Sequence, residues 1–287
     1  MKEIVIIPAW QRPEFLAATL ERLRAADEGT QEFWISLDRR HSKAVAMVAT
    51  DFRRTVGERV KVLTRSHSYR GNSYNVLVSY AEAMAQKPDL IHLVEEDIFV
   101  SDDYFAWHQA AHALVGNCFA VSAARNQNFP GDPEPEPGAV YVHEAYQSVA
   151  VSFRTQRLAH VLQHVARSNN YYRDPVKYCR QLFPATKIPH GNAEQDGLIN
   201  RVVEKLGAFV VYPTEPVAYH AGFTGYHRAG DSPLKTGVPV QVAARALLEM
   251  DAAEMNRRAH SYPDHQVVDV HARHVLPNRV VGWPVLP

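Results

Sequence analysis

Apolar runs and amphipathic segments alternate regularly over about the first 100 residues of the chain. Residues 3–8, EIVIIP, form a β-branched run closed by proline, which predicts a buried strand. Residues 12–26 follow with apolar side chains at helical spacing and with Pro13 in the first turn. Further strands are predicted at 32–38, 59–65 and 89–95, and further helices at 42–56 and 75–86. This alternation predicts a parallel, doubly wound α/β sheet, in which ligands bind at the carboxyl ends of the strands.

A proline-rich segment, NFPGDPEPEPGAV, interrupts this pattern at residues 128–140. Its four prolines and two glycines exclude a regular element and predict an exposed loop between two halves. Beyond it, residues 139–153 alternate as strands do, and residues 154–167 have helical spacing. Residues 192–213 predict a helix closed by a glycine and then a strand, and residues 238–260 predict a late helix. The last 25 residues show no pattern that predicts an element.

The composition is that of an ordinary globular protein. Of 287 residues, 46% are hydrophobic and 22% are charged, and 31 Lys+Arg balance 31 Asp+Glu, so the overall charge indicates neither nucleic acid nor membrane as a partner. Cys118 and Cys179 stand 61 residues apart without a CxxC motif, which predicts reduced thiols. No apolar run reaches the roughly 7–15 residues of a secretion signal or the about 20 of a transmembrane helix, so we expect a cytoplasmic protein.

The motifs of the commonest α/β enzymes are missing from the sequence. There is no GxxxxGK[ST] phosphate loop, no GxGxxG after the first predicted strand, and no GxSxG nucleophile motif. The stretch HEAYQ lacks the second histidine of a zinc-protease HExxH motif. P-loop NTPases, dinucleotide dehydrogenases and α/β-hydrolases are therefore disfavoured.

Acidic side chains follow two of the predicted strands. Asp38 ends the second strand, and Glu95, Glu96 and Asp97 end the fourth. Such a triplet is either an exposed acidic loop or a site for Mg²⁺ or Mn²⁺. Hard cations bind one or two protein carboxylates and complete their shell with substrate phosphates. A strand-end carboxylate would suit a reaction in which a nucleotide diphosphate leaves, because that charge has to be neutralised.

Four segments resemble, in chain order, those of nucleotide-diphospho-sugar glycosyltransferases of the GT-A fold. They are IVIIPAWQRPEFLAATLERL, RGNSYNVLVSYAEAM, HLVEEDIFVSDDYFAWH and EQDGLINRVVEKLGAFVVYPTEPVAYHAGFTGYH. The first resembles the opening of family 2-like enzymes, and the third resembles the EDD form of the DxD motif in N-acetylglucosaminyltransferase I-like enzymes. The resemblance covers roughly residues 3–228. It implies a hexosyl- or N-acetylhexosaminyltransferase that uses a nucleotide-diphospho-sugar, most simply a UDP-sugar, with Mn²⁺ or Mg²⁺.

The resemblance also implies a domain organisation. A GT-A catalytic domain would span 1–235, with a Rossmann-like, mostly parallel central sheet flanked by helices. Within it, a nucleotide-sugar half at 1–127 would precede the loop at 128–140 and an acceptor half at 141–235. Residues 236–287 would form a C-terminal extension packed on the same domain.

Carried over residue by residue, the resemblance implies a nucleotide site and a metal site. The nucleotide site would consist of Pro8, Ala9, Arg12, Asp38, Arg70, Asn72, Glu95 and Glu96. The metal ligands would be Asp97, the last acid of the triplet, and His220, which follows the last strand. An ordinary strand-to-helix turn explains several of these residues as well, and a single histidine after a strand is often a packed or surface residue.

The catalytic base is expected within NAEQDGL. An inverting transfer needs one carboxylate to take the acceptor proton. The common family pattern is EDxDL, and a strict match places Gln195, which cannot accept a proton, at the base position. Asp196 is then the first candidate and Glu194 the second, unless the enzyme retains the anomeric configuration. Acids at a helix N-terminus also stabilise the helix dipole without any catalytic role.

A basic and aromatic segment lies where the acceptor would bind. Residues 145–193 contain seven Lys or Arg and one acid, Asp174, with tyrosines interleaved. This composition favours an anionic acceptor, such as a hydroxylated base in DNA or a phosphorylated lipid or glycan. A solvated helix face, balanced by acids elsewhere, is the alternative.

Two other functions remain open at the level of sequence. A nucleotidyltransferase acting on sugar phosphates uses a similar sheet and acidic metal site, but usually has a Gly-rich loop after the first strand, and PAWQRPEFL has no glycine. A catalytically decayed binding module is the third hypothesis, because the EDxDL pattern is incomplete.

Overall fold

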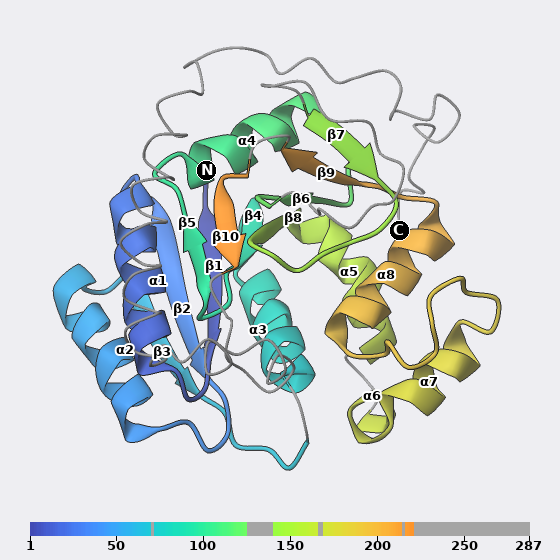
Figure 1. The fold of residues 1–287 in the computed structure, drawn as a ribbon, viewed down its shortest axis with the longest axis horizontal. Helices are drawn as coiled ribbons and strands as arrows, with labels where there is room; N and C mark the ends of the chain where they lie inside the picture. Colours follow the sequence, from blue (N-terminus) through green and yellow to red (C-terminus); the bar gives the residue numbers. More distant parts are fainter. Residues whose placement is uncertain (70–71, 125–139, 166–168, 214–215, 221–287) are drawn as a thin grey trace, which may run out of the picture.

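The β-branched runs at the start of the chain form the centre of a mixed sheet (Figure 1). The computed structural model describes residues 1–69, 72–124, 140–165, 169–213 and 216–220. Within this part, the main sheet has eight strands in the order β3-β2-β1-β4-β8-β6-β9-β7, and β5 and β10 form a separate two-stranded sheet. The strands are β1 (Glu3–Ala9), β2 (Gln31–Leu37), β3 (Val60–Thr64), β4 (Leu90–Leu93), β5 (Ile98–Val100), β6 (Ala120–Ser122), β7 (Val140–His143), β8 (Val151–Arg154), β9 (Val210–Pro213) and β10 (Ala218–His220).

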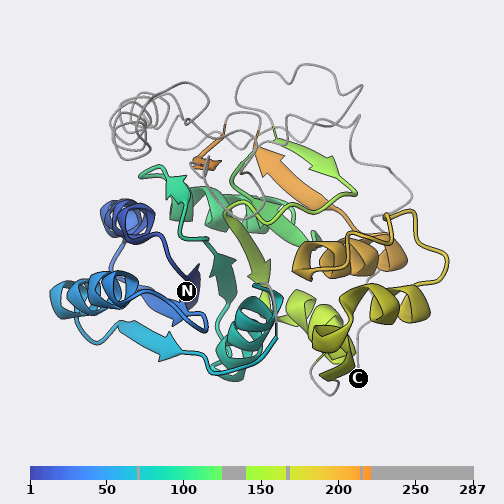
Figure 2. The same cartoon turned by 60° about the horizontal axis from the view of Figure 1, so that its bottom comes forward.

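Helices cover both faces of the main sheet. They are α1 (Pro13–Ala26), α2 (Lys43–Val56), α3 (Ser73–Ala85), α4 (Tyr104–Leu114), α5 (Thr155–Val165), α6 (Asn169–Arg173), α7 (Pro175–Leu182) and α8 (Gln195–Leu206). Figures 1 and 2 both show α1 and α2 at one end of the molecule, and α6 and α7 at the other, beside α5 and α8.

The alternation of side chains along β1 separates two hydrophobic cores. Ile4 and Ile6 are fully buried in a core with residues of α3, α5 and α8. Val5 and Ile7 are fully buried in a second core with residues of α1, α2 and α4. Successive side chains of a strand point to opposite faces, so a central strand with apolar side chains on both faces requires helices on both sides.

The predicted α/β class and its mostly parallel centre are confirmed. β1 pairs in parallel with both β2 and β4, and β2 pairs in parallel with β3. β8, by contrast, pairs antiparallel with β4 and β6, and β7 pairs antiparallel with β9. Side-chain alternation sets the buried face of a strand but not its direction, so the sequence did not predict these reversals.

The end of α8 follows its predicted signal. Gly207 has a left-handed φ of 57°, and β9 begins three residues later at Val210.

Cys118 and Cys179 are buried free thiols, as predicted. The helix predicted at 238–260, the extension at 236–287 and nearly all of the loop at 128–140 lie outside the described residues. No helix in the described part is both long and apolar enough to cross a membrane.

Candidate active site

The acidic triplet lies in a tight turn where β4 leaves the sheet. The amide of Val94 still donates to Ile6 O of β1 at 3.0 Å, and the amide of Ile98 donates back to Glu95 O at 3.0 Å. Glu96 and Asp97 within this turn are only 5% and 3% exposed. The alternative of an exposed acidic loop is therefore wrong, because these two carboxylates are buried and need partners.

Arg12 at the N-terminus of α1 is the partner of both buried carboxylates. Its Nε donates to Glu96 Oε1 at 2.7 Å, and its Nη1 donates to Asp97 Oδ2 at 2.6 Å. The amide of Trp10 donates to the other oxygen of Glu96 at 2.8 Å. Burial by itself lowers the pKa of Arg12, but the charges of Asp97 and Glu96 outweigh it and raise that pKa above its ordinary value. The β1–α1 turn thus holds two of the three acids through a charged guanidinium.

Glu95 has a different environment from its two neighbours. Its Oε1 accepts long hydrogen bonds from Asn72 Nδ2 at 3.4 Å and Gln195 Nε2 at 3.5 Å. Burial, followed by the negative charges of Asp97 and Asp196, raises the pKa of Glu95 to about 8. Glu95 therefore faces the starts of α3 and α8 rather than the β1–α1 turn.

The first turn of α8 brings a second carboxylate to Glu95. The amide of Gln195 donates to Ser73 Oγ at 3.0 Å, which ties the start of α8 to the start of α3. Asp196 Oδ2 accepts a hydrogen bond from Ser148 Oγ at 3.0 Å. Burial, with a smaller contribution from the charge of Glu194, raises the pKa of Asp196 to about 6. A carboxyl group with a pKa in this range can exchange a proton near neutral pH.

Glu194, the second candidate base, lies at the N-cap of α8. Its side chain is exposed and makes no capping hydrogen bond. Between the two acids that the sequence proposed for the base, Asp196 is the one held beside Glu95, so the geometry favours Asp196.

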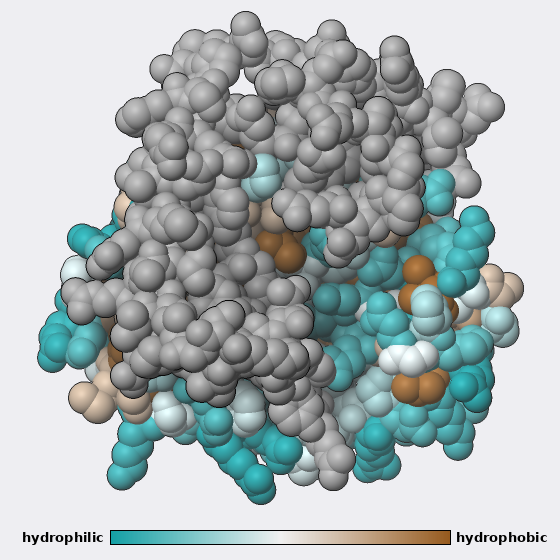
Figure 3. All heavy atoms as spheres, in the orientation of Figure 1, coloured by the Kyte–Doolittle hydropathy of each residue, from teal (hydrophilic) through white to brown (hydrophobic). Residues whose placement is uncertain are grey.

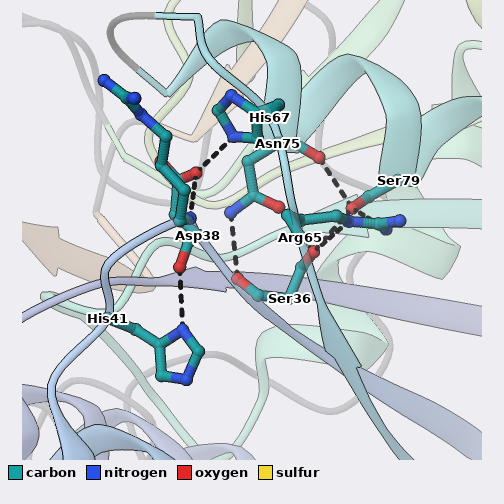
Figure 4. A network of polar contacts seen from close by, with 8 residues as sticks. Ser36, Asp38, His41, Arg65, His67, Asn75 and Ser79 are labelled. Atoms are coloured by element: carbon teal, nitrogen blue, oxygen red, sulfur yellow. Dashed lines mark hydrogen bonds and ion pairs between the residues drawn. The ribbon is translucent and has the colours of Figure 1, made fainter.

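Asp38 lies at the carboxyl end of β2, in a network with His67 (Figure 4). Its amide donates to Ala9 O at 2.9 Å, which places it beside the end of β1. Its Oδ1 lies 2.7 Å from His67 Nε2 and also accepts from the amide of Arg39 at 2.6 Å. The neighbouring contacts of Ser36, Arg65, Asn75 and Ser79 hold β2 against α3.

Pro8 and Ala9, the last residues of β1, are buried, so they can border a ligand mainly through their backbone.

Three half-buried tyrosines connect α3 and the segment before it to α6. Tyr69, Tyr74 and Tyr172, here called the tyrosine belt, have ring centroids 5.0–5.2 Å apart in each pair. The ring of His67 lies 4.4 Å from that of Tyr74, and Tyr171 continues the contact at 5.2 Å from Tyr172. The belt thus runs from the Asp38 network to α6.

The predicted basic segment is only partly a surface feature. Arg173, Lys177 and Arg180 are exposed along α6 and α7 and form no ion pair with another described residue. The surface over these helices is mainly hydrophilic (Figure 3). Arg154, in contrast, points to α4 and donates to His112 O at 2.7 Å, and Arg167 lies outside the described residues.

The structure places most of the predicted site residues but not all of them. It brings Glu95, Asn72 and Asp196 together, and it joins Arg12 to the two other acids of the triplet. Arg70 lies outside the described residues, and for His220 only the backbone, at the end of β10, is described. Sequence reasoning missed the roles of Ser73 and Ser148, because single serines carry no signal without their partners in space.

Of the two metal ligands that the resemblance implies, only the carboxylate has a described side chain. Asp97 is the expected ligand, and its Oδ2 is held by Arg12. Among the described residues, no three His, Cys, Asp or Glu side chains are grouped to hold a metal by themselves. One carboxylate with substrate phosphates is nevertheless a normal Mg²⁺ or Mn²⁺ arrangement, so Asp97 fits this role provided that a nucleotide diphosphate supplies the other oxygens.

Comparisons with known proteins agree with this fold. No protein-family model matches the chain, and no curated protein matches its sequence. The chain is similar to the mannosyltransferase PcManGT from Pyrobaculum calidifontis in complex with GDP-Man and Mn²⁺, with a TM-score of 0.53 and 12% identity over 91% of this chain and 73% of that one. It is also similar to S. aureus TarS 1–349 in complex with UDP-GlcNAc, with a TM-score of 0.51 and 14% identity over the same shares.

These similarities establish the fold alone. The eight-stranded sheet flanked by helices is the α/β fold of GT-A glycosyltransferases. The chain spans only 60% of another TarS 1–349 structure, at a TM-score of 0.47, which is too low for an inference. The fold by itself does not determine the activity, the donor or the acceptor.

Proposed function

We propose that the protein is a glycosyltransferase that moves a sugar from a nucleotide-diphosphate donor to a hydroxyl acceptor. The observation that carries this proposal is the meeting of Glu95 and Asp196 at the carboxyl edge of β4, next to the Asp38 network at the ends of β1 and β2. In α/β sheets this edge is the usual place for a nucleotide. The similarity to enzymes solved with GDP-Man and UDP-GlcNAc supports a nucleotide-sugar donor.

Asp196 is proposed as the catalytic base. The acceptor oxygen would attack the anomeric carbon of the donor, and its proton would pass to Asp196. The bond between that carbon and the diphosphate oxygen would break, and its electron pair would leave with the nucleotide diphosphate. The burial of Asp196 and its hydrogen bond from Ser148 support this role. Asp38, Arg12, Asn72 and the backbone of Pro8 and Ala9 are proposed to hold the nucleotide.

Mn²⁺ or Mg²⁺ is proposed as the cofactor. Asp97 would hold it, with His220 as the second protein ligand that the resemblance suggests. When bound, such a cation neutralises the charge of the departing diphosphate. Arg12 would then have to share Asp97 with the cation, since one oxygen of that carboxylate is already bonded to its guanidinium.

A UDP-sugar is the proposed donor, and the transferred group is proposed to be a hexosyl or N-acetylhexosaminyl unit.

An anionic acceptor is proposed because Arg173, Lys177 and Arg180 project from α6 and α7 beside the tyrosine belt. Stacking rings next to cations suit a nucleic acid, such as DNA with a hydroxylated base, better than a lipid headgroup. The catalytic domain is proposed to span 1–235.

A donor panel tests the proposal. The protein would be incubated with UDP- and GDP-sugars and Mn²⁺, and nucleoside diphosphate release would be measured. We expect slow release from one donor by hydrolysis, and faster release when an acceptor is added. Pyrophosphate release from a nucleoside triphosphate and a sugar phosphate would instead identify a nucleotidyltransferase. Tight nucleotide binding without any release would identify a binding module.

A further inference from the structure

The side chain of Gln195 is buried at the start of α8 without full use of its hydrogen-bonding groups. Gln195 is 7% exposed, and its backbone N–H donates to Ser73 Oγ at 3.0 Å. Its Nε2 reaches Glu95 Oε1 only at 3.5 Å. Its Oε1 is buried and has no hydrogen-bond partner among the described residues. A buried amide oxygen without a hydrogen-bond partner is unfavourable, so a bound group is expected to satisfy it.

Neighbouring polar groups also have missing or long hydrogen bonds. Asp196 Oδ1 is also buried without a described partner, although Oδ2 of the same carboxylate is bonded to Ser148. The hydrogen bond from Asn72 Nδ2 to Glu95 is long, at 3.4 Å. Two acceptor oxygens without a described partner and two side-chain amide nitrogens with long hydrogen bonds therefore lie together, at the starts of α3 and α8 and the end of β4.

The chemistry of this cluster selects its ligand. It contains two carboxyl groups, and no described Lys or Arg hydrogen-bonds to Glu95, Gln195 or Asp196, so the cluster offers a phosphate no cationic hydrogen-bond donor. No group of three metal-binding side chains is found in the described residues. A hydroxyl group is both donor and acceptor, so adjacent hydroxyls can donate to the amide and carboxylate oxygens and accept from the amide nitrogens.

We propose that Asn72, Glu95 and Gln195 form a subsite that binds the hydroxyl groups of the transferred sugar, with Gln195 as a residue that determines donor specificity. The proposal rests on the proposed glycosyltransferase function. Gln195 cannot take the acceptor proton, so its contribution is to position the sugar beside Asp196. A glutamine at the position where the family commonly has an acid would then serve binding, not catalysis.

Binding measurements separate the sugar from the nucleotide. Calorimetry would compare the affinity for the preferred nucleotide sugar with that for its nucleoside diphosphate, in wild type, Gln195→Ala and Gln195→Glu. We expect both variants to bind the diphosphate as wild type does and to bind the nucleotide sugar about 10-fold more weakly, the loss of a hydrogen bond to a buried group. The isosteric glutamate lacks the amide donor and adds charge beside Glu95, so it should not rescue binding. Gln181→Ala, an exposed glutamine on α7, is the matched control.

Each outcome of this experiment is decisive. If Gln195→Ala misfolds, the isosteric Gln195→Glu supplies the answer, and melting temperatures show which variants are folded. Wild-type affinity for the nucleotide sugar in a folded Gln195 variant would overturn the subsite while leaving the proposed function intact. Failure of the wild-type protein to bind any nucleoside diphosphate would overturn the proposed function and the subsite with it.

Discussion

Asp196, the proposed catalytic base, has an energetic cost to the fold. Burial raises its pKa to about 6, from an ordinary value of 3.8, so the folded protein disfavours its charged form. The stabilising contribution of this group is complete below pH 3.8 and is lost as the pH rises through about 6. At neutral pH the ionised side chain therefore lowers stability, as is common for groups kept for catalysis.

Replacing Asp196 by Asn should separate activity from stability. We expect kcat to fall by about 100-fold or more, the usual contribution of a general base, while donor affinity is retained. The melting temperature at pH 8 should equal or exceed that of wild type, because the buried charge is gone. For wild type, kcat/KM should rise with pH through about 6. Near-normal turnover by Asp196→Asn would move the base elsewhere, with Glu194→Gln as the comparison.

At the scale of elements, the start of α8 is held by close packing against the preceding turn. Arg201, only 1% exposed, donates to Asn192 O, to Pro189 O at 2.9 Å and to Gly197 O at 2.8 Å. A Cβ added to Gly197 would lie 2.0 Å from Asn192 O. Only glycine therefore permits the contact that positions the first turn of the helix.

The variant Gly197→Ala should displace this turn. We expect a loss of about 1–3 kcal/mol in the free energy of unfolding, since backbone atoms have to move apart, and a fall in kcat because Gln195 and Asp196 move with them. Urea denaturation and the donor assay would measure both. Gly191→Ala, where the added Cβ meets nothing within 4 Å, is the control and should behave as wild type. Unchanged stability of Gly197→Ala would show that the turn can adapt.

Helix α4 carries two histidines that are buried in their neutral form. His108 Nδ1 and His112 Nε2 lie 2.6 and 2.9 Å from Ser152 Oγ of β8. Burial and then neighbouring positive charge lower the pKa of His112 to about 3, and burial also lowers the pKa of His108 well below 6.5. The unfolded chain therefore binds more protons than the folded one below pH 6.5.

The contribution of these histidines to stability should consequently fall as the pH decreases below about 6.5, whereas the raised pKa values of Glu95 and Asp196 act in the opposite direction. For His112 the slope is about 1.4 kcal/mol per pH unit between about pH 6.5 and 3, so wild type and variant are compared by unfolding curves at pH 7 and pH 5. The stability of His112→Gln relative to that of wild type should be greater at pH 5 than at pH 7. His190→Gln, an exposed position, should keep the wild-type difference. Equal pH dependence in all three proteins would contradict the assignment.

At the scale of the whole molecule, the two ends of the sheet have different surfaces. The exposed cations of α6 and α7 adjoin the tyrosine belt, whereas α1 and α2 lie at the opposite end (Figures 1 and 2). An anionic acceptor should therefore depend on one end of the molecule only, although the formal net charge of the chain is zero.

Acceptor binding should be sensitive to salt and to charge reversal on α7. Three phosphate contacts predict a loss of about 20- to 40-fold in oligonucleotide affinity between about 50 and 200 mM salt. The double variant Lys177→Glu and Arg180→Glu should bind more weakly and with a shallower salt dependence. The same change at Arg24 and Arg53, exposed on α1 and α2, should have little effect. Fluorescence anisotropy would measure both, and salt-independent binding would exclude a polyanion.

Much of the fold and part of the site could be predicted from the sequence. The longer strands and helices of the first 100 residues followed from local periodicity, and Gly207 marked the end of α8 as expected, whereas the short β5 and β6 and the helices α6 and α7 were not predicted. The acids at strand ends could be recognised because parallel strands bring their carboxyl ends to one edge. The partners of these acids could not be predicted: Arg12 is 84 residues from Glu96, and Gln195 is 100 residues from Glu95.

The sequence by itself determined the alternation of strands and helices, the apolar faces that bury the sheet and the set of acids available for chemistry. These properties are encoded in near neighbours along the chain, whose spacing decides which face of an element is buried. Only the tertiary structure decided how the acidic triplet divides. Glu96 and Asp97 are neutralised by Arg12, while Glu95 faces Gln195 and Asp196. That division depends on where α1, α3 and α8 begin relative to one turn, which is set by the packing of helices on the two faces of the sheet and not by spacing along the sequence.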